Sequence, residues 1–388
     1  MLLRVACVLV LCGILVAGLW PFHAPRNNVG WLAQGAGLEI GKYGSIVTAG
    51  EFTNAKPDTD GSCSLEIWLA PGRASASGTI LAFYRPETHS SPFALRQSLS
   101  DLSIESLFRG RRQNGSKTKV YVDDFFIHPK LVLLTLSSNP SGTSLYANGA
   151  FVKTLPNFRF SPQDLTGRLI LGNSPFSTHE WSGNVKGLAI YPRGLIPEEV
   201  AQHYQQWTAG AQSAPGESAI AFYRFDEGSG PLIHNRVDQA TNLTIPSRFF
   251  ILDEQFLERP WKEFRNDTHY WEDVVVNIAG FIPLGLVLFA YFSVAAKFKN
   301  AALLTVAIGF AASLTIEVGQ AFLPTRNSGM TDLMTNTLGT ALGVLLFRLD
   351  FVKKMFATVG LIPCSSKASN ITEPIPEFAA AGTSDSAK

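Results

Sequence analysis

Three apolar stretches between Asp273 and Gly343 decide the fold, and each carries acids or amides near one end, in Asp273-Val-Val-Val-Asn277, Glu317-Val-Gly-Gln320 and Asp332-Leu-Met-Thr-Asn336. The stretches run over Val274–Ala295, Ala301–Phe322 and Met330–Phe347, each near the ~20 residues that a bilayer-crossing helix requires. An acid or amide buried in lipid costs several kcal/mol unless it has a partner. The sequence therefore predicts membrane-spanning helices whose polar residues form a cluster.

A fourth apolar stretch, Leu2–Trp20, opens the chain and has a single Arg4 near its start. A positive N-terminal flank holds that end in the cytoplasm, and a Trp suits the opposite interface. The stretch fits either a cleaved signal peptide or a permanent anchor helix. We expect the anchor, because the small residues around Ala17-Gly18 do not make a clean cleavage site.

Basic residues in the connections set the expected topology. Lys297 and Lys299 follow the first of the C-terminal stretches, and Arg348, Lys353 and Lys354 follow the last. The positive-inside rule puts both segments in the cytoplasm. We therefore expect about four transmembrane helices with both termini inside, and the long region between the first and second helices outside.

This topology brings the polar residues to the outer side of the membrane. Their spacings, i,i+4 or i,i+3, put each pair on one helical face. Gly339 and Gly343 continue the face of Asp332 and permit a close approach between helices. Arg326, in the external loop, is the expected counter-charge. The predicted cluster comprises Asp273, Asn277, Glu317, Gln320, Arg326, Asp332 and Asn336.

Glu317 and Asp332 are the candidate catalytic residues of this cluster. In an enzyme or carrier for a lipid-linked glycan, burial would raise the pKa of one of them so that it acts as an acid or base. Arg326 would then hold a phosphate. The alternative is that these groups simply hydrogen-bond the helices together. A transporter has little support, because many transporters are built from internal repeats and the four expected helices show none.

Between Pro21 and about Arg265 the chain has short alternating segments in place of spanning stretches. Ser64–Leu69 and Lys119–Val122 alternate apolar and polar residues, and Asn148-Gly149 separates two further alternating runs. Asn-Gly between such runs indicates a hairpin, because both turn residues need a positive φ. Many short strands at this spacing predict an antiparallel β-sandwich. One surface helix is expected over Leu195–Gln206, with Glu198-Glu199 in its first turn.

Ser144-Leu-Tyr-Ala-Asn-Gly-Ala-Phe-Val152 resembles a hairpin of laminin-G-like, concanavalin A-like domains, and Trp181–Tyr191 is similar to one of their closing strands. The resemblance covers roughly Gly37–Ser247 and implies a jelly-roll sandwich. That fold serves lectins, glycanases, adhesion modules and inert spacers. Its catalytic version needs two glutamates alternating on one strand. We find no such pattern. The sequence therefore favours a protein that is not an enzyme, but it does not exclude an enzyme.

Several side chains of this region are candidates for ligand binding. Tyr121 and Trp181 could stack on sugars if they are exposed, but we expect most aromatic side chains of this region to lie in the core. Asp123 and Asp124 are weak calcium candidates, since calcium takes carboxylate oxygens, and the alternative is a solvated turn. We expect no other cofactor and no structural disulfide, because the four cysteines include no CxxC pair and Cys63 has no partner in its compartment. A net charge of +1 gives no case for nucleic acid binding.

The membrane stretches also resemble a family. Asn277-Ile-Ala-Gly-Phe-Ile-Pro-Leu-Gly285, Glu317-Val-Gly-Gln320 with Arg326, and Asp332–Gly339 look like the VanZ-like pattern N-x-x-x-F-x-P-x-G … E-x-x-Q … R … D-x-x-x-N-x-x-G. Pro25-x-Asn27-x-Val29-x-Trp31-Leu32 is similar to the family's first external segment. The resemblance implies a bacterial inner-membrane protein, and the family's founding member is tied to low-level teicoplanin resistance. It carries over no catalytic residues.

The expected organisation follows the chain: an anchor helix at 1–20, an external connector at 21–36, a laminin-G-like sandwich at 37–247, a juxtamembrane connector at 248–272, VanZ-like membrane helices at 273–348 and a largely disordered cytoplasmic tail at 349–388. Trp261, Tyr270 and Trp271 suit the membrane interface. We expect a cell-envelope protein that displays a carbohydrate-binding sandwich. Its expected partners are membrane lipid and a polysaccharide or lipid-linked glycan, with a link to glycopeptide tolerance or to envelope polysaccharide handling.

Overall fold

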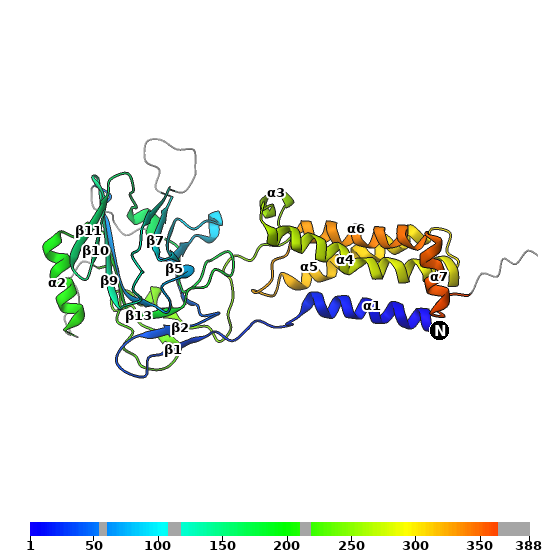
Figure 1. Ribbon diagram of the computed structural model, residues 1–388. Helices are drawn as coiled ribbons and strands as arrows, with labels where there is room; N and C mark the ends of the chain where they lie inside the picture. Colours follow the sequence, from blue (N-terminus) through cyan, green and yellow to red (C-terminus); the bar gives the residue numbers. More distant parts are fainter. Residues whose placement is uncertain (54–59, 108–117, 210–218, 364–388) are drawn as a thin grey trace, which may run out of the picture. The chain divides into compact units, whose positions relative to one another are not determined.

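The protein consists of a β-sandwich and a set of long helices (Figure 1). The computed structural model describes residues 1–53, 60–107, 118–209 and 219–363. By its internal contacts the chain divides into two units, one of residues 1–14, 268–312 and 334 onward, the other of residues 15–267 and 313–333. Cys364 and the disordered tail expected after it lie outside the described residues.

Two antiparallel sheets form the sandwich, as the alternating segments predicted. Along the first sheet lie β1 (Val29–Trp31), β2 (Leu38–Ile40), β13 (Gly183–Tyr191), β4 (Cys63–Pro71), β9 (Val132–Asn139), β10 (Gly142–Ala147) and β11 (Ala150–Leu155), with β14 (Ala221–Tyr223) also paired to β13. Along the second lie β15 (Leu232–Ile233), β16 (Leu243–Thr244), β3 (Ile46–Thr48), β12 (Arg168–Leu171), β5 (Ala76–Tyr84), β6 (Phe93–Leu99), β7 (Asp101–Ser106) and β8 (Thr118–Val122). Short 3-10 turns cover Pro86–Thr88, Pro162–Leu165 and Gln239–Thr241.

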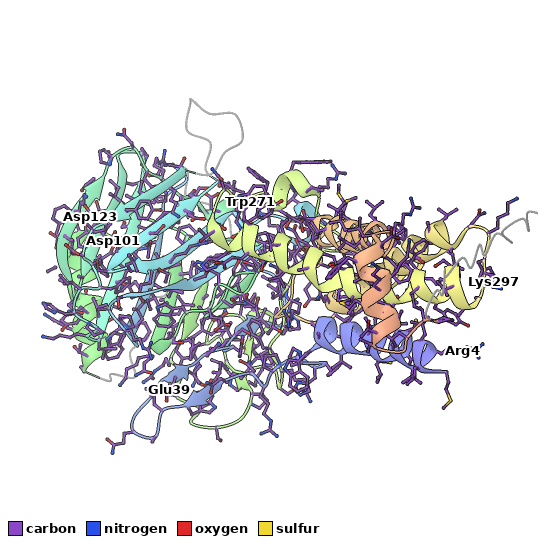
Figure 2. All side chains as sticks on the ribbon, turned by 45° about the vertical axis from the view of Figure 1, so that its right-hand side comes forward. Arg4, Glu39, Asp101, Asp123, Trp271 and Lys297 are labelled. Atoms are coloured by element: carbon purple, nitrogen blue, oxygen red, sulfur yellow. The ribbon has the colours of Figure 1, made fainter. Side chains whose placement is uncertain are left out.

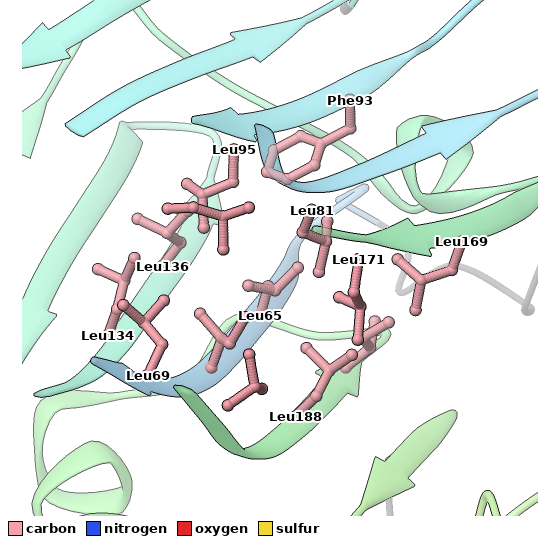
Figure 3. Close-up of a cluster of buried hydrophobic side chains, with 14 of the residues drawn as sticks. Leu65, Leu69, Leu81, Phe93, Leu95, Leu134, Leu136, Leu169, Leu171 and Leu188 are labelled. Carbon is pink, nitrogen blue, oxygen red and sulfur yellow. The ribbon is translucent and has the colours of Figure 1, made fainter. Parts of the chain in front are cut away.

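The core lies between the sheets and consists mainly of leucine, isoleucine and phenylalanine (Figure 3). Leu65, Ile67 and Leu69 of β4 point inward, as period-two alternation requires, and meet Leu81 and Leu95 of the second sheet. The predicted Asn-Gly turn joins β10 to β11, where Asn148 and Gly149 have φ of 52° and 80°. The hairpin resemblance is therefore carried by a turn with the expected geometry.

Helix α2 (Pro197–Thr208) lies on the outer face of the first sheet, packing Leu195 and Val200 against Tyr191 and Phe222. Beneath it lies Glu66, whose side chain is wholly buried. Its carboxylate accepts hydrogen bonds from Thr135, Tyr191 and Trp207 and pairs with His203 Nδ1 at 3.1 Å. Burial and this carboxylate hold the pKa of Tyr191 far above its usual value. The buried carboxylate of Glu66 is thus fully satisfied beneath α2.

The two segments that lead into and out of the sandwich pair with each other. Asn27 N donates to Ser247 O at 3.3 Å, and Phe249 N donates to Pro25 O at 3.0 Å. Asn27 also donates through Nδ2 to the carbonyls of Ser45 and Pro246, at 2.7 and 2.9 Å, and accepts from Ser45 N at 2.8 Å. The side chain therefore ties together both segments and strand β3.

Besides α2, the described helices are α1 (Leu2–Leu19), α3 (Pro260–Glu263), α4 (Thr268–Ala290) with a π-helical end at Tyr291–Ala295, α5 (Ala301–Gln320), α6 (Met330–Phe347) and α7 (Asp350–Thr358). Three of them, α1, Thr268–Ala295 and α5, are long and apolar enough to cross a membrane. Asp332, Asn336 and several threonines make the first half of α6 more polar, and its crossing stays a prediction. Helix α7 begins inside the segment expected to be a tail.

Glycines set the packing of α6 against α4. A methyl group on Gly339 would collide with the carbonyl oxygen of Ile278, and one on Gly343 with that of Ile282. From the α4 side, a methyl group on Gly285 would collide with the Thr340 carbonyl. The two backbones therefore approach so closely that only hydrogen fits between them at these positions.

Candidate functional site

Glu317, near the end of α5, is the most buried acid of the predicted membrane cluster, with 1% of its surface exposed. Its Oε2 accepts the backbone N–H of Gly329 at 2.8 Å, and the Ser328 side chain also hydrogen-bonds the carboxylate. Gly329 directly precedes α6, where the first backbone N–H groups lack partners within the helix. Glu317 therefore anchors the loop that leads into α6.

A second acid, which the sequence reasoning missed, caps the same helix. Glu263 of α3 accepts hydrogen bonds from the backbone N–H of Thr331, at 3.0 Å, and from the Thr331 hydroxyl. Next to it, Glu258 N donates to Ser328 O at 3.0 Å and Met330 N donates to Glu258 O at 2.9 Å. Two glutamates from distant parts of the chain thus complete the start of α6, which favours negative charge. The sequence offered no signal, because neither contact is local.

Gln320 and Arg326 hold the end of α1. Gln320 Nε2 donates to Gly18 O at 2.9 Å, and Arg326 donates to Trp20 O at 3.2 and 2.9 Å. The Gly18 carbonyl belongs to the last turn of α1 and the Trp20 carbonyl directly follows the helix, where carbonyl groups lack partners within the helix. The hydrogen bonds give both side chains a structural use, alongside the role of counter-charge expected for Arg326.

The remaining members of the cluster are on α4 and α6. Asp332 is half-buried in the first turn of α6, and Asn336 is 4% exposed one turn later. Asp273 is exposed and Asn277 half-buried near the start of α4. Asp273, Asn277 and Asn336 belong to a different unit from Glu317, so their meeting in one pocket stays a prediction.

A different polar cluster covers part of the outer face of the second sheet. Cross-strand register places Thr79 of β5, Arg96 of β6, Ser103 of β7 and Tyr121 of β8 side by side in one row. Glu105 and Lys119 pair in the adjacent row. We call these six residues the polar face: Thr79, Arg96, Ser103, Glu105, Lys119 and Tyr121. Beside it, Leu252 packs on Ala82, Ala94 and Ile170 and covers the neighbouring part of the sheet.

Ion pairs link the polar face. Glu105 Oε1 lies 3.3 Å from Lys119 Nζ and 3.6 Å from Arg96 Nε. Lys119 Nζ also lies 5.0 Å from the centre of the Tyr121 ring. Partial burial acts to lower the pKa of Lys119, but its hydrogen bond with Tyr121 and the charge of Glu105 raise it overall. Lys119 is therefore a firmly charged cation at neutral pH.

His179 borders the polar face from the loop before β13. Its Nδ1 lies 3.3 Å from Thr79 Oγ1. Burial lowers the pKa of His179, and the charge of Arg96 lowers it further, so the ring is neutral at pH 7. Two polar atoms of the face, Ser103 Oγ and Arg96 Nε, are buried without a hydrogen-bond partner among the described residues.

The two aromatic candidates differ in exposure. Tyr121 is 45% exposed on the polar face. Trp181 is 1% exposed and donates from Nε1 to Gln97 Oε1 at 2.9 Å. Trp181 is therefore one of the core aromatics and does not meet the condition of exposure, whereas Tyr121 does.

Asp123 and Asp124 lie in the turn after β8, at the corner where Figure 2 labels Asp101 and Asp123. Asp124 accepts from Ser100 Oγ at 3.0 Å, and its backbone N–H donates to Asp101 Oδ1 at 2.9 Å. In this polar turn, Asp101 accepts a backbone N–H and Asp124 accepts a side-chain hydroxyl. In the described part of the chain, no three His, Cys, Asp or Glu side chains are grouped to hold a metal ion.

Two family models match the chain: VanZ/LLP1 over residues 219–352, and the concanavalin A-like lectin/glucanases superfamily over residues 44–201. Both resemblances expected from the motifs are thus confirmed, and the chain combines a VanZ-like region with a concanavalin A-like sandwich. The VanZ-like match begins at residue 219 and so includes the last strands of the sandwich, β14 to β16. No curated protein matches the chain.

Solved structures resemble the chain only distantly. A candidate carbohydrate-binding protein from Bacteroides ovatus shares 12% identity over 56% of this chain and 58% of its own, with a TM-score of 0.38. The receptor-binding domain of a botulinum neurotoxin C/D mosaic serotype shares 13% identity over 46% and 45%, with a TM-score of 0.35. The binding domain of botulinum neurotoxin DC, solved with rat synaptotagmin II, shares 12% over 47% and 45%, with a TM-score of 0.33. This chain thus spans about half the length of those structures.

Proposed function

We propose that this protein is an integral membrane protein of the bacterial cell envelope whose sandwich binds carbohydrate outside the membrane. The apolar helices and the VanZ-like match support the membrane assignment. The concanavalin A-like match supports a sugar-binding role for the sandwich. Handling of envelope polysaccharide, including an effect on glycopeptide tolerance, is the finer form of the proposal.

The proposed sidedness agrees with the basic residues at one end of the helices. Arg4 lies 5.8 Å over the ring of Tyr291, and Arg348 lies 5.8 Å over that of Phe289. The start of α1, the end of α4 and the end of α6 are therefore neighbours, and Lys297 follows at the same end (Figure 2). Under the positive-inside rule this end faces the cytoplasm and the sandwich lies outside.

The observation that carries the sugar-binding proposal is the contrast between the two sheets. Helix α2 covers β13 and β14 on the outer face of the first sheet, while the polar face of the second carries an exposed Tyr121 beside charged and hydroxyl side chains. An aromatic ring with a polar rim suits a pyranose, which has an apolar face and hydroxyls around its edge. The same fold serves many functions, so the site has to be tested directly.

The test measures binding of envelope polysaccharides to the full chain in lipid nanodiscs. Tyr121→Ala should weaken binding by about tenfold or more, the loss of a central aromatic contact. Phe151→Ala is the matched control, because Phe151 is a 60% exposed aromatic on β11 of the other sheet. Equal binding by both variants, or no binding of any polysaccharide by the unaltered protein, overturns the proposal. For the finer form, deletion of the gene should change the teicoplanin concentration that stops growth.

A second candidate is an enzyme or carrier for a lipid-linked glycan that uses Glu317 and Asp332. The near-complete burial of Glu317 favours it, since buried carboxylates are common in active sites. The hydrogen bond to Gly329 favours a structural role instead. Glu317→Gln retains an acceptor for that bond but removes the acid. If Glu317→Gln and Asp332→Asn both fold and leave the envelope phenotype unchanged, the catalytic role is excluded.

A further inference from the structure

The charges of the polar face do not balance. Arg96 and Lys119 are cations, Glu105 is an anion, and the bordering His179 is neutral at pH 7, because burial and the charge of Arg96 lower its pKa. One positive charge therefore remains on a partly enclosed surface, where the side chains of Arg96 and Glu105 are 23% and 10% exposed. Charge in such surroundings is screened less than on an open surface.

The hydrogen-bond donors of the face are also incompletely used. Arg96 Nε lies 3.6 Å from Glu105, which is an ion-pair distance too long for a hydrogen bond. Ser103, directly opposite Arg96, is wholly buried, and its Oγ lacks a partner among the described residues. A buried donor left unpaired costs about 1–3 kcal/mol. Both atoms lie beneath the surface of the polar face, so a ligand meets the exposed parts of Arg96 and Lys119, whose side chains are 23% and 40% exposed.

We propose that the polar face selects acidic sugars, with the ligand's carboxylate held by Arg96 and Lys119; this inference rests on the carbohydrate binding proposed above. A guanidinium and a carboxylate form short, charge-assisted and often bidentate hydrogen bonds. Tyr121, next to Ser103 in the same row, stacks on the sugar ring. Glu105 accepts hydrogen bonds from sugar hydroxyls and holds both cations in place when the site is empty.

The test compares two ligand sets on the full chain in zwitterionic nanodiscs by calorimetric titration. One set contains oligomers of glucuronic, galacturonic and mannuronic acid. The other contains the same oligomers after their carboxyl groups are reduced to alcohols. We expect at least one acidic oligomer to bind about tenfold or more tightly than its reduced form. Equal affinity for the two forms overturns the acidic selectivity but leaves the proposed carbohydrate binding standing. If the protein binds neither neutral nor acidic polysaccharides, both proposals are overturned.

Two variants separate ligand binding from folding. Arg96→Gln should weaken binding of the acidic oligomer by about thirtyfold and abolish the preference over the reduced form. Ser103→Ala removes a hydroxyl that lies buried beneath the row, out of a ligand's reach, and should leave the affinity unchanged. Lys153→Gln removes an exposed cation of β11 and should likewise leave the affinity unchanged. Unchanged affinity in Arg96→Gln contradicts the proposed position of the carboxylate.

Discussion

Asn27 shows how one side chain closes the sandwich. Its amide group makes three hydrogen bonds, two to Ser45 and one to Pro246, and so joins residues that are up to 219 positions apart. The sequence pattern around Asn27 resembles the first external segment of VanZ-like proteins. In this protein the Asn27 side chain holds the two ends of the sandwich together.

Asn27→Ala should therefore destabilise the edge of the sandwich by about 1–3 kcal/mol, since the partners of the lost amide are left partly unpaired. Hydrogen exchange is the appropriate measurement, because a chain of two units does not have a single melting transition. Exchange should accelerate in peptides that cover β3 and residues 246–249. Asn28→Ala, at an exposed neighbour, should leave exchange unchanged. Equal protection in both variants contradicts the role assigned to Asn27.

Glu199 makes a pH-dependent contribution at the start of α2. Its Oε2 accepts the Ile196 N–H at 3.1 Å and pairs with Arg193 at 2.7 Å. The hydrogen bond with Arg193 is the main reason that the pKa of Glu199 lies below its ordinary value. A carboxyl with a lowered folded-state pKa stabilises the protein above its unfolded pKa, and this stabilisation is lost as the pH falls through the folded-state value.

Glu199→Gln should thus destabilise α2 at pH 7 by roughly 0.5–1 kcal/mol, a figure that allows for solvent screening of this partly exposed pair. The difference from the unaltered protein should shrink as the pH falls below about 4.3, the ordinary pKa of a glutamate. Hydrogen exchange in peptides that cover α2, compared between the two proteins at each pH, gives the comparison. Glu198→Gln, at the exposed neighbour, should show a smaller effect at every pH. A Glu199→Gln difference that persists at pH 3 would rule out this account.

At the scale of elements, the contact between α4 and α6 depends on glycines. Gly339→Ala should prevent the close approach at Ile278, because the new methyl group meets a backbone carbonyl that cannot rotate away. Gly280→Ala is the matched control on α4, where nothing lies within 4 Å of the added group. The yield of folded protein in detergent, measured by size-exclusion chromatography, should fall for Gly339→Ala only. Equal yields would show that the helices can separate without loss of the fold.

Elements with local signals could be predicted from the sequence. The Asn148-Gly149 hairpin, the helix after Leu195 and the apolar helices follow from turn chemistry and periodicity, which act over a few residues. The order of strands could not be predicted, because β13 lies between β2 and β4 through contacts spanning most of the sandwich. The same limit explains the candidate site. Glu317 was identified as a costly buried acid, but its neighbours Glu258 and Glu263 come from a connector more than 50 residues away.

At the scale of the whole molecule, the chain enters and leaves the sandwich at neighbouring positions. The hydrogen bonds between residues 25–27 and 247–249 bring its two ends together. A domain with adjacent ends can be inserted between two helices without separating them. This arrangement agrees with a sandwich inserted between α1 and α4 of a VanZ-like membrane domain. It also makes the number of crossings after the sandwich the decisive question for topology.

Accessible cysteines answer that question. In a chain whose natural cysteines are replaced by alanine, single cysteines at Lys153, Lys299 and Lys354 report on the sandwich, the α4–α5 connection and the segment after α6. We expect a membrane-impermeant maleimide to label the Lys153→Cys variant in intact cells, and the other two only after permeabilisation. The polar first half of α6 makes the third position the most informative. If Lys354→Cys is labelled in intact cells and Lys299→Cys is not, α6 does not cross the membrane. The segment after α6 then lies outside, and of the two ends of the chain only the N-terminus is cytoplasmic.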